Sequence, residues 1–139
     1  MDAGSWSDRY AATELVWSAQ PNQFFAAEVA TLPSGKALDL GTGEGRNAIS
    51  LAEQGWDVTA VDFSSVAIGK AKAIAEKRGA HVTWMVADLM TYVPPPGAFD
   101  LVALMYVHVP AVQRRLVIER AVPAVAPGGS LLNHWTRLH

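Results

Sequence analysis

A glycine-rich turn in the first third of the chain has residue types and spacing that could bind a ligand. Residues 36–40 form a short, nearly continuous apolar run, typical of a buried parallel strand, and lead into Gly41-Thr42-Gly43-Glu44-Gly45. Glycine tolerates positive φ angles and lets a ligand approach the backbone closely. A dinucleotide fingerprint would place its third glycine at Arg46, so the spacing disfavours a bound pyrophosphate. The turn predicts a ligand site of another kind, unless it merely links a strand to a helix.

Acidic residues stand at the ends of the next two apolar runs. Asp62 lies 21 residues beyond Gly41, and Asp88 follows the third run. A carboxylate at the end of a second strand can accept two hydrogen bonds from a ribose diol. Because parallel strands end at one edge of a sheet, Asp39 or the glycine turn, Asp62 and Asp88 are expected to converge there. Asp62 and Asp88 could instead cap helices or form turns.

Short apolar runs alternate with longer helical stretches, which predicts one α/β domain over residues 1–139. Expected strands cover residues 36–40, 56–61, 81–87, 99–105 and 130–135, and the fifth follows a turn at Pro127-Gly128-Gly129. Expected helices cover residues 6–19, 22–32, 45–54, 65–78 and 111–122. Right-handed crossovers then place helices on both faces of a mostly parallel sheet. The sheet core is expected over residues 36–135, preceded by a helical segment over residues 1–32.

Composition excludes several classes of protein. The 139 residues carry a net charge of −2, which argues against a nucleic-acid binder or a polybasic membrane anchor. The chain has no cysteine, so it has no thiolate nucleophile, disulfide or cysteine-based zinc site, and its four histidines lack helical metal-site spacing. No apolar run approaches the roughly 18–20 residues of a membrane span. Because the N-terminus also lacks signal-peptide features, a soluble cytoplasmic protein without a metal is expected.

Several motifs in this order resemble the class I S-adenosylmethionine (SAM)-dependent methyltransferases. They are Asp39 with the turn Gly41-Thr42-Gly43-Glu44-Gly45, Asp62, Ala87-Asp88-Leu89 and Phe99-Asp100-Leu101-Val102. A second set is similar to the tellurite-resistance and thiopurine-type small-molecule methyltransferases: Gly45-Arg46-Asn47-Ala48 with Trp6, Arg9, Tyr10, Trp17, Pro21 and Asn22. The resemblance covers residues 6–135 and implies a Rossmann-like three-layer sandwich.

The resemblance implies roles for the residues around the turn. Asp39 and the turn from Gly41 through Thr42 to Gly43 would lie along the methionine part of SAM. Asp62 would hold the ribose hydroxyls.

It also implies contacts to the rest of the cofactor. Phe63 would lie against the adenine, and Asp88 would accept from the exocyclic amine, with the Leu89 backbone nearby. The loop that begins near Met105 would lie beside the methionine and the sulfonium. Arg46 could pair with the SAM carboxylate, or could be a solvated helix residue.

Aromatic residues near the N-terminus share one helical face. Trp6, Tyr10 and Trp17 could fasten a helix to the sheet, or could form a lid with aromatic faces near the sulfonium, as the resemblance implies. After the fourth strand, His108 could act as a general base beside Tyr106, or could hydrogen-bond a loop carbonyl. Both are weak candidates, because SAM already carries a charged leaving group and in-line positioning accounts for most of the catalysis.

The chain stops soon after the fifth strand, so strands six and seven of the methyltransferase core are expected to be absent. The exposed edge of strand five then invites pairing in a homo-oligomer. The sequence predicts a SAM-dependent methyltransferase that acts on a small-molecule acceptor and yields S-adenosylhomocysteine. One alternative is a non-catalytic SAM-binding module, or a truncated fragment, that acts through a protein partner. Another is an NAD-dependent oxidoreductase, which Arg46 disfavours.

Overall fold

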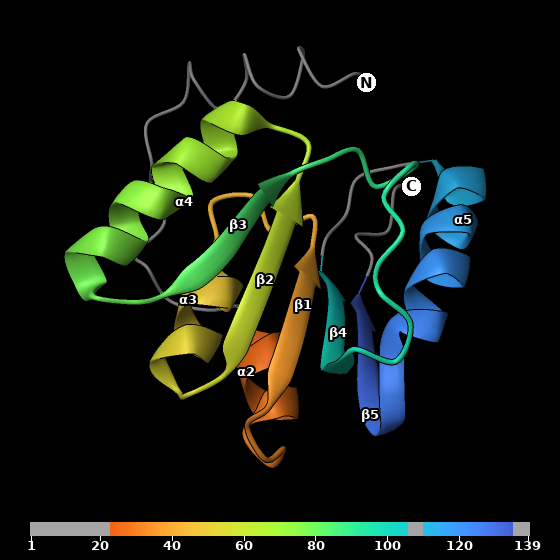
Figure 1. Cartoon of the computed structure of the whole chain (residues 1–139), viewed down its shortest axis with the longest axis horizontal. Helices are drawn as coiled ribbons and strands as arrows, with labels where there is room; N and C mark the ends of the chain where they lie inside the picture. The colour runs from red at the N-terminus through yellow and green to blue at the C-terminus, as the bar shows by residue number, and fades with distance from the viewer. Residues whose placement is uncertain (1–22, 106–109, 135–139) are drawn as a thin grey trace.

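The computed structural model describes residues 23–105 and 110–134, which form a five-stranded sheet with flanking helices (Figure 1). Every strand pair is parallel, and the order across the sheet is β3-β2-β1-β4-β5. The predicted Rossmann-like α/β architecture is confirmed. In chain order the elements are α2 (Gln23–Val29), β1 (Lys36–Leu40), α3 (Arg46–Glu53), β2 (Asp57–Asp62), α4 (Ser65–Arg78), β3 (Val82–Val86), β4 (Phe99–Met105), α5 (Ala111–Ala121), the 3-10 helix η1 (Val122–Ala124) and β5 (Val125–His134).

The strand order places a switch point between β1 and β4. The chain runs outward from β1 through β2 to β3 and then returns to β4 on the other side of β1. Asp39 of β1 is in register with Ala60 of β2 and with Ala103 of β4. In open parallel sheets, ligands bind outside the carboxyl ends of the strands at such a point. The fold therefore directs attention to the edge at which β1, β2 and β4 end.

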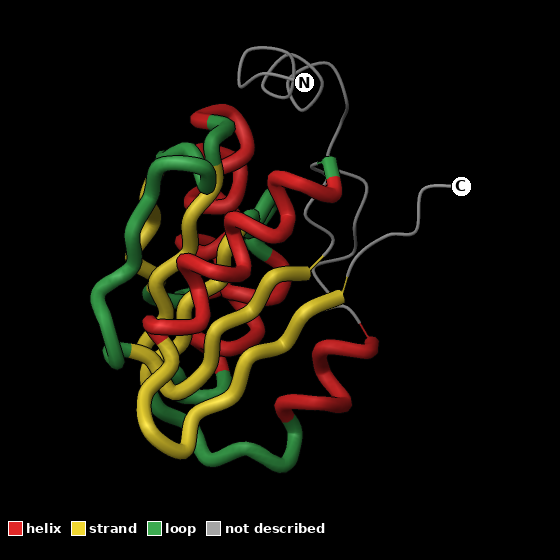
Figure 2. The backbone as a smooth tube through the Cα atoms, turned by 90° about the vertical axis from the view of Figure 1, so that its right-hand side faces the viewer, coloured by secondary structure: helices red, strands yellow, loops and turns green. Residues whose placement is uncertain are grey.

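Apolar side chains fill both faces of the sheet, and helices lie on both sides of the strands (Figure 2). On one face, α2 and α3 contribute Phe25, Ala48 and Leu51 to a cluster. On the other face, Val117 of α5 packs with Leu40, and the segment 87–98 adds partly buried side chains. Successive side chains of β1 point to opposite faces of the sheet. Asp39 therefore points to the same face as Ala37, which is the face that α3 covers.

Two predicted boundaries are wrong in detail. The helix predicted over 22–32 ends at Val29, where a turn closes with the Leu32 N–H on the Val29 carbonyl and Pro33 follows. The predicted turn Pro127-Gly128-Gly129 lies inside β5, which already begins at Val125. The register shifts between Phe99 and Leu101 of the partner strand, and Gly128 has φ 79°, so the motif forms an irregularity in the strand instead of a turn before it.

The edge of the sheet at β5 is unpaired within the part of the chain that the structure describes, since β5 pairs there with β4 alone. A homo-oligomer through this edge stays a prediction. The helix predicted over 6–19 lies outside the described residues. Among the described helices, none has the length and apolar character needed to cross a membrane.

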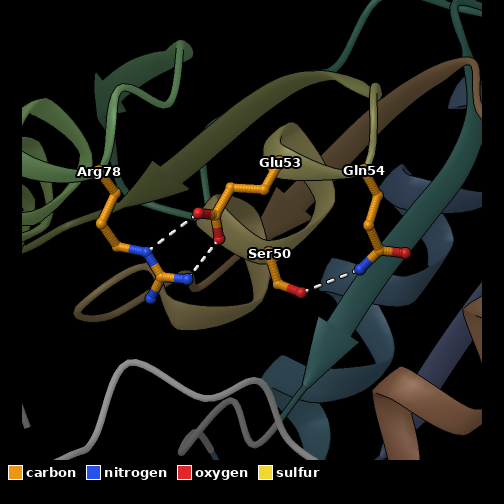
Figure 3. A network of polar contacts seen from close by, with 4 residues as sticks. All are labelled: Ser50, Glu53, Gln54 and Arg78. Atoms are coloured by element: carbon orange, nitrogen blue, oxygen red, sulfur yellow. Dashed lines mark hydrogen bonds and ion pairs between the residues drawn. The ribbon is translucent and has the colours of Figure 1, made fainter.

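Helices α3 and α4 are joined at their C-terminal ends by an ion pair (Figure 3). Arg78 donates to Glu53 from Nε at 3.1 Å and from Nη2 at 2.5 Å. One turn away, Gln54 donates to the Ser50 hydroxyl at 3.0 Å. Partly exposed pairs of this kind are each worth about 0–1 kcal/mol, so the contact orients the two helices more than it stabilises them.

The start of α3 packs tightly because Gly45 has no side chain. Gly45 has φ 81° and precedes Arg46 as the N-cap. A Cβ atom built on Gly45 would lie 2.7 Å from the Trp84 ring and 2.9 Å from the Ala71 Cβ. The third glycine of the turn therefore brings α3, α4 and β3 together, which in turn fixes where the glycine turn lies.

We predict that Gly45→Ala lowers the free energy of unfolding by more than Gly79→Ala does. Both positions have positive φ, but a Cβ at Gly79 would meet nothing within 4 Å. Strain at positive φ costs roughly 1–2 kcal/mol at either position, and overpacking adds roughly 1–3 kcal/mol at Gly45 alone. Urea unfolding of the two variants measures the difference. Equal losses would contradict a packing role for Gly45.

Candidate functional site

The carboxyl ends of β1 and β2 bring two buried carboxylates together. Asp39 is 2% exposed and Asp62 is 5% exposed. The negative charge of Asp62 contributes to the raised pKa of Asp39, so the two groups interact. The structure therefore places these two predicted site residues at the same edge of the sheet.

Asp62 fastens the glycine turn to the end of β2. Its Oδ1 accepts the Gly43 N–H at 3.2 Å, and its Oδ2 accepts the Ser64 N–H at 3.0 Å. Burial raises the pKa of Asp62, and the hydrogen bonds from Ser64 and Gly43 lower it in part. A carboxylate has about four acceptor positions, so each oxygen retains one for a further donor. Asp62 can therefore accept a pair of hydroxyl groups while it holds the turn.

Asp39 is held from within the turn itself. The Thr42 hydroxyl donates to Asp39 Oδ2 at 2.6 Å. The pKa of Asp39 rises from 3.8 to about 6 because the carboxyl group is buried; the Thr42 bond opposes the rise, and the charge of Asp62 adds to it. The sequence predicted a role for Thr42 through its backbone and not this side-chain contact, although the spacing Asp-x-x-Thr across a turn is compatible with it.

Four backbone N–H groups of the turn donate to acceptors within the protein. Gly41 and Thr42 donate to the Val61 carbonyl at 2.8 and 3.0 Å, and Gly45 donates to the Thr42 carbonyl at 3.0 Å. The Gly43 N–H is taken by Asp62. Donors used in this way are not available to surround a phosphate, so the turn differs from an anion-binding loop. The Asp39 and Asp62 carboxylates make this edge rich in acceptors, which disfavours a dinucleotide and favours a ligand with donors or positive charge.

Two segments adjoin the site: the start of α3, which follows the glycine turn, and the residues after β2, which lead into α4. Arg46 is exposed and begins α3, beside the N-cap Gly45, which makes no side-chain capping bond. The N-terminus of a helix carries a partial positive charge, which Arg46 reinforces. Phe63 is half-buried and directly follows Asp62. Ser64 is fully buried and caps α4 by accepting the Ala67 N–H at 3.1 Å.

Asp88 forms a turn beyond the end of β3. Its Oδ1 accepts the Met90 N–H at 2.8 Å, and its carbonyl accepts the Thr91 and Tyr92 N–H groups. The residue is exposed. This geometry matches the turn-forming role that the sequence left open, and a contact with adenine stays a prediction. The next residue, Leu89, packs its side chain against the core cluster that contains Leu40.

The remaining predicted site residues lie at β4 or outside the described part of the chain. Met105 ends β4, is 5% exposed and belongs to the same core cluster as Ala103, the strand neighbour of Asp39. The candidate lid and candidate base residues lie outside the described residues, and their roles stay predictions: Tyr10, Trp17, Tyr106 and His108.

Comparisons with known proteins agree on one family. A family model described as "Methyltransferase domain" matches residues 37–129, from β1 into β5. Demethylmenaquinone methyltransferase from Thermus thermophilus is 32% identical over 99 residues, which cover 70% of this chain and 45% of that protein. Ubiquinone biosynthesis O-methyltransferase from Coxiella burnetii is 33% identical over 103 residues, covering 73% and 43%. The chain therefore spans less than half the length of these curated relatives.

A solved structure has the same fold. The N-methyltransferase NodS from Bradyrhizobium japonicum WM9, in complex with S-adenosyl-L-homocysteine, superimposes with a TM-score of 0.76 at 24% identity. The match covers 95% of this chain and 72% of NodS. At this identity the likeness establishes the arrangement of strands and helices.

We predict that Asp39→Asn stabilises the fold at neutral pH. Because the folded state raises the pKa of Asp39 from 3.8 to about 6, it binds a proton more tightly than the unfolded chain does. The resulting stabilisation is complete below about pH 4 and is lost as the pH rises through about 6. At 1.36 kcal/mol per pKa unit, the ionised Asp39 costs up to about 3 kcal/mol at pH 7.5, and an amide avoids this cost.

Urea unfolding at pH 7.5 and pH 4 tests this prediction. The advantage of Asp39→Asn over the wild type should shrink or reverse at the lower pH. Asp57→Asn is the matched control, because Asp57 is an exposed aspartate at the other end of β2. A stability difference for Asp39→Asn that is independent of pH would contradict the prediction.

Proposed function

Because this chain belongs to the methyltransferase domain family, we propose that it binds SAM and that the protein transfers the SAM methyl group to a small-molecule acceptor. The observation that carries the proposal is the group of acceptors at the carboxyl ends of β1 and β2. There four N–H groups of the turn donate within the protein, and the charge of Asp62 acts on the Asp39 carboxyl group. SAM presents ribose hydroxyls, an amino group and a sulfonium, and all of these suit such a site.

The residues present fit the cofactor in several places. Asp62 retains one acceptor position on each oxygen, which suits the two ribose hydroxyls. Phe63, the next residue, would lie against the adenine. Arg46 and the start of α3 offer positive charge to the SAM carboxylate. Asp88 has a second carboxylate oxygen for the adenine amine beyond the one that bonds to Met90.

The chain contributes mainly positioning to the reaction. When bound, SAM supplies a methyl group on a positively charged sulfur, which is a good leaving group. The ends of β1 and β2 and the turn between them hold the cofactor, and Met105 at the end of β4 lies on the same face of the sheet as Asp39. Fixing the methyl group in line with an acceptor converts a bimolecular step into a nearly unimolecular one.

The names of the relatives support a small-molecule acceptor. One is a ubiquinone biosynthesis O-methyltransferase, and another is 2-heptyl-1-hydroxyquinolin-4(1H)-one methyltransferase from Mycobacteroides abscessus, 33% identical over 101 residues. The run Gly45-Arg46-Asn47-Ala48 favours the tellurite-resistance and thiopurine type as the finer assignment.

A second candidate is a SAM-binding module that acts through a partner. The observation that favours it is the outer edge of β5, which has no partner strand among the described residues. The same edge of β5 also supports the predicted homo-oligomer, in which it would pair with a second copy of the chain. Incubation with SAM and a panel of small-molecule acceptors separates the two functions, because only the methyltransferase produces S-adenosylhomocysteine.

We predict that Asp62→Ala weakens SAM binding about 10- to 150-fold. Hydrogen bonds to a charged group contribute about 1.5–3 kcal/mol, and the variant also loses the tie to Gly43. Calorimetric titration with SAM measures the change, and far-UV circular dichroism confirms that the variant folds.

Asp57→Ala serves as the control, because it removes an exposed carboxylate from the opposite end of the same strand. Unchanged affinity in Asp62→Ala would remove the ribose assignment. Binding of NADH by the wild type in place of SAM would remove the proposed function itself.

A further inference from the structure

We propose that Arg120 and Tyr92 form a binding site for a small carboxylic acid in its ionised form. The site lies beside α5, on the face of the sheet opposite the one to which Asp39 points. It is separate from the proposed SAM site and does not depend on the proposed function. Its starting point is a guanidinium group that the fold partly buries without an acceptor.

Arg120 lies near the end of α5 and is half-buried. Its Nη1 atom is closed off from solvent and has no hydrogen-bond acceptor within the described residues. No ion pair in the same part of the chain includes Arg120. Arg115 on the same helix is exposed, by contrast, and pairs with Glu119 at 3.4 Å. Because buried donors are nearly always paired, an unpaired guanidinium nitrogen indicates that its acceptor comes from elsewhere.

Arg120 lines a narrow hollow between α5 and the segment that follows β3. Protein atoms leave about 180 Å³ unfilled there, part of it open to solvent, and the interior is too narrow for a water molecule. Apart from Arg120 and Tyr92, the lining is aliphatic: Leu40, Leu89, Pro94, Val117 and Ala121. Mostly apolar walls with a few polar groups are typical of small-molecule sites.

Tyr92 supplies a second donor to the same hollow. Burial raises the pKa of its hydroxyl group, which is therefore protonated at neutral pH and can donate. Within the described residues, this hydroxyl makes no hydrogen bond of its own. The side chain is half-buried and belongs to a segment outside the helices and strands. Its ring can therefore turn toward solvent without breaking a hydrogen bond, and this movement would widen the hollow for a ligand.

The protein itself offers no anion to this hollow, because none of the residues that line it is acidic. Glu119, the acidic neighbour of Arg120 on α5, pairs with Arg115. Asp88, on the segment after β3, is exposed and accepts the Met90 N–H through Oδ1. The acceptor for the guanidinium group is therefore expected to be a ligand.

A carboxylate suits the two donors and the walls. A guanidinium group binds a carboxylate through parallel N–H donors, and a phenol can donate to a remaining lone pair of the same oxygens. Aliphatic walls favour a short hydrocarbon chain attached to the carboxylate. They offer no partners for the additional charge and oxygens of a phosphate, and unpaired charge is costly to bury. The chemistry therefore points to a short aliphatic acid such as butanoate.

Thermal unfolding with sodium butanoate or sodium chloride, at equal ionic strength and pH 7.5, tests the proposal. The proteins are the wild type, Arg120→Met and Arg115→Met, since methionine keeps much of the side-chain length without the charge. Arg115→Met is the matched control, because Arg115 is an exposed arginine of the same helix. At ten times its dissociation constant, butanoate should raise the unfolding temperature of the wild type and Arg115→Met by roughly 3–6 °C. Arg120→Met should show no shift.

Calorimetric titration supplies a second readout and does not rely on Arg120→Met folding. Tyr92→Phe keeps the ring and removes the hydroxyl donor, so its affinity for butanoate should fall about 3- to 10-fold. Inorganic phosphate should bind the wild type more weakly than butanoate does.

The outcomes that contradict the proposal differ for each part of it. A wild type that butanoate does not stabilise, or an equal shift in the wild type and Arg120→Met, would overturn the site. Equal affinities of the wild type and Tyr92→Phe would overturn the role of Tyr92. Tighter binding of phosphate than of butanoate would overturn the choice of a carboxylate. Because these measurements contain no SAM, their failure would leave the proposed function standing.

Discussion

The site depends on the hydrogen bonds that Asp62 accepts from two turns at once. Gly43 belongs to the turn after β1, and Ser64 belongs to the turn after β2, so one carboxylate joins both. These hydrogen bonds are effective because Asp62 is the last residue of β2 and is buried. Water competes little for the amide donors there. This contact fixes Gly43 of the glycine turn and Ser64 at the entry into α4.

The N–H groups that donate within the protein explain why a glycine turn after a parallel strand need not bind phosphate. Glycine gives a turn freedom, but the partners of its amides decide what the turn offers to a ligand. Here the Val61 carbonyl accepts hydrogen bonds from two amides of the turn, and the Asp62 carboxylate accepts one from a third. These amides are therefore used within the protein. The same strand–turn–helix unit that holds a pyrophosphate in dinucleotide-binding proteins thus suits a cationic nucleoside in this chain.

Sequence patterns predicted the elements and the edge of the sheet where the site lies, because apolar periodicity and the position of an acid after a strand are local signals. They did not predict that Thr42 bonds to Asp39, since the direction of a hydroxyl depends on the folded turn. They did not predict that Gly45 packs against Trp84, a residue far along the chain. Pro127-Gly128-Gly129 was misinterpreted for a related reason: only pairing with β4 shows that the strand continues through it.

The burial of Asp39 is informative because it works against folding. A buried carboxylate without a cationic partner is costly, and an apolar residue between Ala60 and Ala103 would pack there without that cost. The Thr42 bond reduces the cost but does not remove it, since the pKa of Asp39 still rises to about 6. A buried carboxylate that destabilises the free protein supports the proposed role of Asp39 in ligand binding. Asp88 differs from Asp39, because its hydrogen bonds are those of a turn.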